Sequence, residues 1–142
     1  MKKTILVVED DPLELELTLA GLDTYCAGID VASVSDGAEA IEYLFARAQA
    51  SGNSLSDTSL VIMDINMPRL DGISAVKALR NDRRTALTPI VMLSNSDDPR
   101  DVKAAYEAGA NAFVRKPGLG ASSRELFGHM VPFWTKFNQA TA

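Results

Sequence analysis

The sequence predicts an α/β fold in which helices cover both faces of a parallel β-sheet. Five short apolar runs alternate along the chain with segments of helical spacing. The runs lack the polar alternation of a half-exposed strand, so they suit strands that are buried on both faces. Strands that alternate with helices in this way form parallel sheets, because each parallel pair needs a long crossover connection.

The first strand is predicted over residues 4–8, and it ends at the acidic residues 9–11. Pro12 directly after Asp11 is typical of a proline at the first helical position behind an aspartate N-cap. The next leucines alternate as in a strand, but leucine and glutamate favour helices and the start signals are strong. We therefore predict a helix from Pro12, with leucines in helical spacing at positions 15, 19 and 22.

The middle of the chain continues the alternation. A strand is predicted over 29–34 and a helix over 38–50, and the polar residues 51–59 are expected to form a surface loop. The third strand, Leu-Val-Ile-Met over 60–63, ends at Asp64. A turn closed by glycine follows this strand at once.

The same alternation extends towards the carboxyl end. Apolar residues between Ile73 and Leu79 mark a third helix, and a fourth strand over 89–93 ends at Ser94. A fourth helix is predicted from 97–99 to Gly109, followed by a short fifth strand over 112–114. All five strands would thus bring their carboxyl ends to one edge of the sheet.

The carboxyl-terminal helix has two local signals. Ser122 and Glu125 have capping-box spacing, and Pro132 is expected to kink the helix. An aromatic group lies directly after this proline: Phe133, Trp134 and Phe137. These rings either close the core or form the interface of a homodimer, and both alternatives stay open.

Length and composition bound the class of protein. The 142 residues suit one domain over residues 1–142, without an effector domain. No apolar run is long enough to span a membrane, so a cytoplasmic protein is expected. The single Cys26 excludes an internal disulfide and a multi-cysteine zinc site. The net charge of −5 argues against a nucleic-acid partner.

Polar residues that follow the strands should meet at one edge of the sheet. They are Glu9, Asp10, Asp64, Ser94 and Lys116. Two unit charges about 4 Å apart repel by roughly 4 kcal/mol at an effective dielectric of about 20, so clustered carboxylates require a cation or a proton. Oxygen ligands without histidine or cysteine favour a hard ion such as Mg²⁺, which also binds phosphate oxygens.

This edge therefore suits a phosphoryl group. Lys116 would contact the phosphoryl oxygens as a point charge, and Ser94 would donate one hydrogen bond. Asp64 is a candidate nucleophile, since carboxylates can form acyl phosphates.

The motifs together resemble the receiver domain of two-component response regulators. They are Val-Val-Glu-Asp over 7–10, Met-Asp-Ile-Asn-Met-Pro-Arg-Leu-Asp-Gly over 63–72, Ser94, and Phe-Val-Arg-Lys-Pro over 113–117. The resemblance covers nearly the whole chain and implies a flavodoxin-like (βα)5 fold with strand order 2-1-3-4-5, an order for which a chemotaxis member of this family is a standard example. It also implies a phosphorylation-driven switch rather than an enzyme.

The resemblance assigns a role to each site residue. Asp64 would accept the phosphoryl group from a sensor histidine kinase, and Lys116 would contact that group. Ser94 and Phe113 match the switch pair, although Phe113 lacks the hydroxyl of the usual tyrosine. Mg²⁺ or Mn²⁺ would be bound by Glu9, Asp10, Asp64 and the backbone carbonyl of Asn66. The downstream partner is unknown.

A closer similarity is to the single-domain regulators paired with bacterial phytochromes. It rests on the Glu-Asp-Asp-Pro start at 9–12, the long 51–59 segment, Ser-Asn-Ser-Asp over 94–97, and Phe133-Trp134. This similarity implies a phytochrome-type histidine kinase as partner.

Three rival functions share parts of the pattern. A phosphatase of the haloacid-dehalogenase type requires a second aspartate, as general acid, two positions after its nucleophile, and this chain has Asn66 at that position. A flavodoxin-type FMN carrier needs a neutral phosphate loop, whereas residues 9–11 are acidic. A receiver-like module that binds partners without phosphorylation would not need the complete set of acids, serine and lysine.

Overall fold

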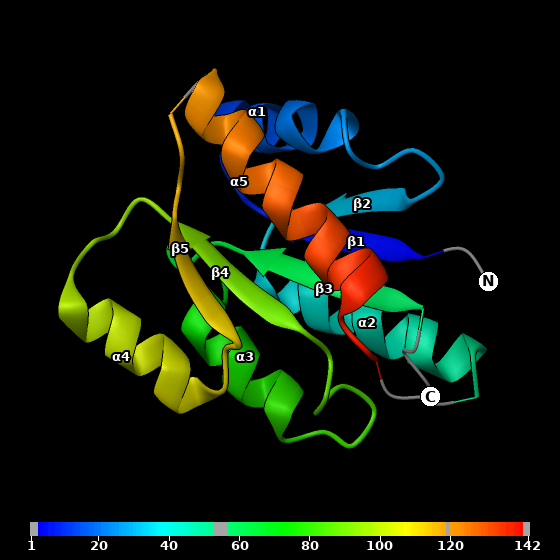
Figure 1. Ribbon diagram of the computed structural model, residues 1–142. Helices are drawn as coiled ribbons and strands as arrows, with labels where there is room; N and C mark the ends of the chain where they lie inside the picture. The colour runs from blue at the N-terminus through cyan, green and yellow to red at the C-terminus, as the bar shows by residue number, and fades with distance from the viewer. Residues whose placement is uncertain (1–2, 53–56, 119, 141–142) are drawn as a thin grey trace.

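Five parallel strands form one sheet in a computed structural model that describes residues 3–52, 57–118 and 120–140 (Figure 1). The strand order is β2-β1-β3-β4-β5, so the predicted fold class and strand order are confirmed. The strands are β1 (Thr4–Val8), β2 (Asp30–Val34), β3 (Thr58–Met63), β4 (Ile90–Ser94) and β5 (Ala112–Arg115).

Helices cover both faces of this sheet. Helices α1 and α5 lie on one face, and α2, α3 and α4 lie on the other (Figure 1). Their bounds are α1 (Pro12–Asp23), α2 (Gly37–Ala50), α3 (Gly72–Arg80), α4 (Pro99–Ala108) and α5 (Ala121–Pro132). Over the described ranges, no helix is both long and apolar enough to cross a membrane.

Alternate residues of the central strands enter two separate cores. Leu6 and Val61 pack with apolar residues of α2, α3 and α4, whereas Ile5 and Ile62 pack with residues of α1 and α5. All residues of β1, β3 and β4 are buried, which explains the unbroken apolar runs in the sequence.

Aspartate side chains begin the first four helices. Asp11, Asp36, Asp71 and Asp98 each accept a hydrogen bond from a backbone N–H of the first turn of the helix that follows. The prediction of a helix from Pro12 is confirmed despite the alternating leucines. Of the alternating leucines, Leu13 and Leu17 are exposed, whereas Leu15 and Leu19 are partly buried and pack against the core.

Two local predictions were wrong. Strand β3 begins at Thr58, so the loop expected over 51–59 is shorter at its carboxyl end, and residues 53–56 lie outside the described part. Helix α5 begins after Gly120, whose φ of 80° suits glycine, and it has no side-chain cap. Ser122 already lies inside the helix, so it does not form the expected capping box with Glu125.

Pro132 marks a change of helix type. The segment η1 (Phe133–Phe137) is a π-helix that follows α5 directly, and the N–H of Asn138 donates to the carbonyl of Phe133 at 2.7 Å. Proline has no N–H to continue the α-helical pattern, and a wider turn accommodates the interruption. The structure thus shows a π-helical turn directly after Pro132, and a kink of the helix axis there stays a prediction.

A glycine lets α3 begin against the end of β3. A Cβ at Gly72 would lie 1.9 Å from the carbonyl oxygen of Asp64, and the Gly72 N–H donates to the carbonyl of Ile65 at 2.8 Å. Both neighbours are backbone atoms, which cannot move aside as a flexible side chain would.

We therefore expect Gly72→Ala to destabilise the protein by about 1–3 kcal/mol or more, because the methyl group overpacks a backbone contact. Gly118→Ala is the matched control, since no heavy atom lies within 4 Å of a Cβ at that position. Urea unfolding of both variants measures the difference. Equal stability of the two would contradict the close approach of α3 to Asp64.

Candidate functional site

The carboxyl ends of β1 and β3 bring three carboxylates together. Val8 and Met63 are paired in the sheet, so Glu9 and Asp64 follow neighbouring positions. The Asp64 N–H donates to the carbonyl of Val8 at 3.1 Å, which extends the ladder to the site. One carboxylate oxygen from each of Glu9, Asp10 and Asp64 lies within 4.8 Å of the others. The structure thus brings these predicted residues together.

Lys116 reaches the same cluster from the end of β5. Its N–H donates to the carbonyl of Ser94 at 2.8 Å, which directs the residue over the strand ends. The ammonium Nζ lies 2.5 Å from Glu9 Oε1, 3.6 Å from Asp64 Oδ2 and 3.4 Å from Glu14 Oε2. The Lys116 side chain is only 7% exposed, and its ammonium forms ion pairs with all three carboxylates.

The other predicted site residues come from β4, from β5 and from the loop that follows Asp64. Ser94 is buried at the end of β4, and its Oγ accepts a hydrogen bond from the Ser96 N–H at 3.1 Å. Phe113 is half-buried in β5 and packs beside the core under α2, α3 and α4. Asn66 is exposed in the loop that follows Asp64.

An ion pair holds the loop between β3 and α3. Arg69, with a left-handed φ of 61°, donates to Asp36 through Nε at 2.7 Å and through Nη2 at 3.1 Å. The hydrogen bond from Arg69 lowers the pKa of the Asp36 carboxyl, which also caps α2. The loop that contains Asn66 is thereby tied to the first turn of α2.

Two contacts of the site region were not predicted from the sequence. Glu14 contacts Lys116, although it reads only as a helix-forming residue in the first turn of α1. The Tyr106 hydroxyl accepts a hydrogen bond from the Phe113 N–H at 3.1 Å. No sequence spacing signals either contact, because both depend on which side chains tertiary folding brings together.

Residues 5–125 match the family model of the response regulator receiver domain. The chain belongs to this family. Receiver domains are the phosphorylation-activated signalling modules of two-component systems, and they bind Mg²⁺ at an acidic pocket.

Relatives of this receiver domain have diverse outputs. It is 37% identical over 126 residues to the transcriptional regulatory protein GltR of Pseudomonas aeruginosa, a match that covers 87% of this chain and 46% of the relative. It is 32% identical over 112 residues to the chemotaxis protein CheY1 of Helicobacter pylori, covering 79% and 84%. This chain thus spans about half the length of the transcriptional regulator, but most of the chemotaxis protein.

The fold also resembles a solved phytochrome response regulator. The phosphorylated cyanobacterial protein RcpA has 26% sequence identity and a TM-score of 0.81, with 100% of both chains covered. The predicted similarity to regulators associated with phytochromes is therefore confirmed at the level of structural neighbours.

The electrostatics of this receiver's acidic pocket fit a divalent cation. Burial raises the pKa of Glu9 to about 7, and the charge of Asp64 adds to this rise while Lys116 opposes it. Burial lowers the pKa of Lys116, but its carboxylate neighbours outweigh that effect and hold the pKa above its usual value. The Lys116 ammonium thus offsets the effect of burial on the Glu9 pKa only in part, and oxygen ligands of this kind suit a hard cation.

Stability of the metal-free protein should therefore depend on pH. Between about pH 4.5 and 7 the folded state binds more protons at Glu9 than the unfolded state does, so the free energy of unfolding should fall as pH rises through this window. The expected loss is on the order of 3 kcal/mol, since one pKa unit corresponds to about 1.4 kcal/mol. Urea unfolding in chelator at several pH values measures the slope.

Glu9→Gln should remove this slope, whereas Glu16→Gln, which changes an exposed residue of α1, should retain it. A wild-type slope that persists in Glu9→Gln would show that another group titrates.

Proposed function

We propose that this receiver accepts a phosphoryl group on Asp64 from a sensor histidine kinase. The observation that carries the proposal is the Lys116 ammonium, which lies 3.6 Å from Asp64 Oδ2 inside a cluster of acids. Mg²⁺ or Mn²⁺ would be bound by Glu9, Asp10, Asp64 and the backbone carbonyl of Asn66. The cation would neutralise charge on the transferred group and on the acids around it.

The proposed transfer is a single substitution at phosphorus. A carboxylate oxygen of Asp64 forms a bond to phosphorus as the bond between phosphorus and the kinase imidazole breaks, and the electron pair of that bond returns to the imidazole nitrogen. Lys116 stabilises charge on the phosphoryl oxygens, because it is already held beside Asp64 and needs no reorganisation. Asp64 is 13% exposed, so its carboxylate can be reached by a donor.

Intact mass should show one added phosphoryl group when the protein is incubated with acetyl phosphate and Mg²⁺, and none in Asp64→Asn. Asp71→Asn is the matched control, because Asp71 is an exposed acid of the same loop that caps α3. Equal labelling of the Asp64 and Asp71 variants would sink the assignment. Absence of labelling in the wild type would favour a receiver-like module that binds partners without phosphorylation.

Ser94 and Phe113 are the proposed route from the acceptor to the surface. The Ser94 hydroxyl can follow the phosphoryl oxygens and leave space into which the ring of Phe113 turns. Such a shift needs contacts that differ between two states. The Phe113 N–H is bound by Tyr106 of α4, so a change at Phe113 bears directly on that helix.

A phytochrome-type histidine kinase is the proposed phosphodonor. The support is the likeness to RcpA, a cyanobacterial phytochrome response regulator solved in its phosphorylated form. The downstream partner is a further protein that reads the altered surface.

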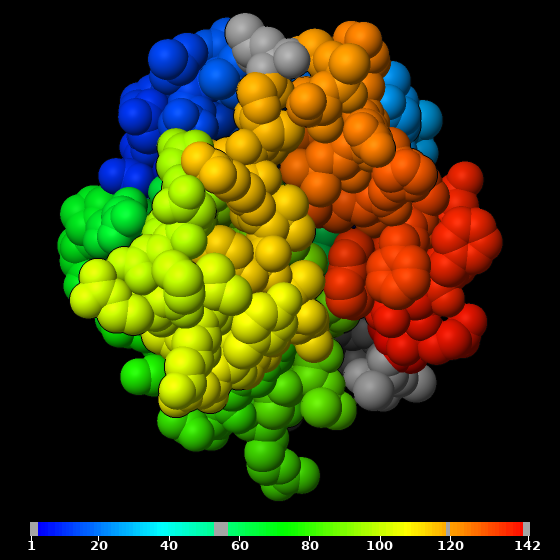
Figure 2. All heavy atoms as spheres, turned by 60° about the vertical axis from the view of Figure 1, so that its left-hand side comes forward, coloured from blue at the N-terminus to red at the C-terminus, as the bar shows by residue number. Residues whose placement is uncertain are grey.

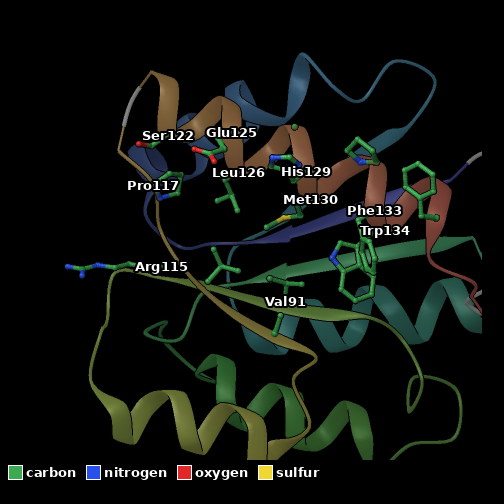
Figure 3. Close-up of a pocket in the computed structure, with 15 residues that line it drawn as sticks. Val91, Arg115, Pro117, Ser122, Glu125, Leu126, His129, Met130, Phe133 and Trp134 are labelled. Atoms are coloured by element: carbon green, nitrogen blue, oxygen red, sulfur yellow. The ribbon is translucent and has the colours of Figure 1, made fainter.

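A homodimer is the proposed assembly of the switch. A cavity of about 950 Å³ lies between β5 and the segment formed by α5 and η1, and its lining is mainly apolar (Figure 3). Figure 2 shows this hollow on the molecular surface, beside the aromatic carboxyl-terminal segment. Trp134 is partly buried and packs against the core beneath α1 and α5, so it closes the core, whereas Phe133 and Phe137 are exposed.

Phe137→Ala should weaken this dimer, because an exposed ring at a cavity edge suits an interface anchor. Leu87→Ala is the matched control, since both side chains are 72% exposed and Leu87 precedes β4 away from the cavity. Light scattering with beryllofluoride and Mg²⁺ measures the assembly. A monomer in the wild type at high concentration, or equal dimerisation of both variants, would end the idea.

A further inference from the structure

Glu14 is a third carboxylate beside the Lys116 ammonium, and the proposed transfer does not use it. Its Oε2 lies 3.4 Å from Lys116 Nζ, and its side chain is 32% exposed. Glu9 and Asp64 follow strands of the sheet, whereas Glu14 comes from the first turn of α1. It therefore contacts Lys116 from the outer side of the site.

The helix does not need this carboxylate for its own cap. Glu14 is the third residue after the N-cap Asp11, a position from which glutamate often accepts a hydrogen bond from the N-cap N–H. Here the Asp11 N–H donates to Glu9 Oε2 at 3.4 Å instead. The Asp11 side chain accepts from the N–H groups of Leu13 and Glu14. The Glu14 carboxylate is turned to Lys116.

A small cavity leads to the same pair of charges. It has a volume of about 120 Å³ and lies between α1, residues 116–118 and helix α5. Glu14, Asn95, Lys116 and Pro117 are among its lining residues. An anion in this cavity faces the Glu14 carboxylate as well as the Lys116 ammonium.

We infer that Glu14 is a positioning residue that competes with the phosphoryl group for Lys116 and repels anionic phosphodonors. The inference rests on the proposed role of Asp64 as acceptor. Its consequence is slow labelling by small dianionic donors. The fraction of protein that is phosphorylated then depends on the activity of the kinase rather than on the concentration of such donors. Removal of the Glu14 charge should therefore accelerate labelling.

The test compares Glu14→Gln with Glu16→Gln and wild type. Glu16 is an exposed acid of the same helix and is no ion-pair partner of Lys116 among the described residues, so its variant controls for net charge. Initial labelling rates with Mg²⁺ are measured by intact mass over a range of acetyl phosphate concentrations. The rate of Glu14→Gln at low donor concentration should rise about three- to tenfold, limited by the screening of a partly exposed charge.

The rise should come mainly from a lower KM, with little change in the maximal rate, because Glu14 acts on donor binding. The increase in the labelling rate of Glu14→Gln over wild type should be smaller with phosphoramidate, which carries less negative charge, and smaller at high salt. An unchanged rate in Glu14→Gln while the wild type is labelled would overturn the inference. So would an equal rise in Glu16→Gln.

A second measurement does not depend on phosphorylation. The Lys116 Nζ resonance of the protein without donor should shift in Glu14→Gln and stay unchanged in Glu16→Gln. Identical Nζ spectra in all three proteins would overturn the contact. Failure of the wild type itself to be labelled would count against the proposed function, and the Nζ spectra would still decide whether Glu14 holds Lys116.

Discussion

The contact between Lys116 and Glu9 is the interaction on which the site depends. Nζ and Oε1 are 2.5 Å apart, and the two side chains are only 7% and 4% exposed. Loss of Lys116 would leave its carboxylate partners without this cation, and removal of one partner from a buried ion pair typically costs about 3–5 kcal/mol. The same ammonium also lies near Asp64 and Glu14, so one cation organises acids from two strands and a helix. An incoming phosphoryl group would therefore meet charged side chains whose positions are already fixed.

The backbone of the sheet makes this arrangement possible. Pairing of Val8 with Met63 places Glu9 and Asp64 side by side, and the hydrogen bond from the Lys116 N–H to the Ser94 carbonyl continues the pairing of β5 with β4. Gly72 lets α3 begin against the Asp64 carbonyl, so the loop after Asp64 stays short. The paired strands thus fix the positions of the charged side chains at the carboxyl edge of the sheet, as in other open α/β sheets.

Sequence reasoning succeeded where a single physical cause dominated. Burial on both faces explains the unbroken run at 60–63, and the shared edge of a parallel sheet explains why Glu9, Asp64 and Lys116 meet. It failed at 51–59 because the polar Thr58 and Ser59 belong to a buried strand, and at Ser122 because α5 already begins at Ala121. It also missed Glu14, because a glutamate in a first helical turn is equally suited to solvent, and only the folded position of Lys116 recruits it.

The most direct test of the central claim is to locate the phosphoryl group chemically. Borohydride reduces an aspartyl phosphate to homoserine, so a peptide mass map of the reduced, phosphorylated protein identifies the acceptor. Homoserine is expected at position 64 only, and only when Mg²⁺ was present during labelling. Homoserine at position 10 or 71, or labelling that is independent of a divalent cation, would contradict it.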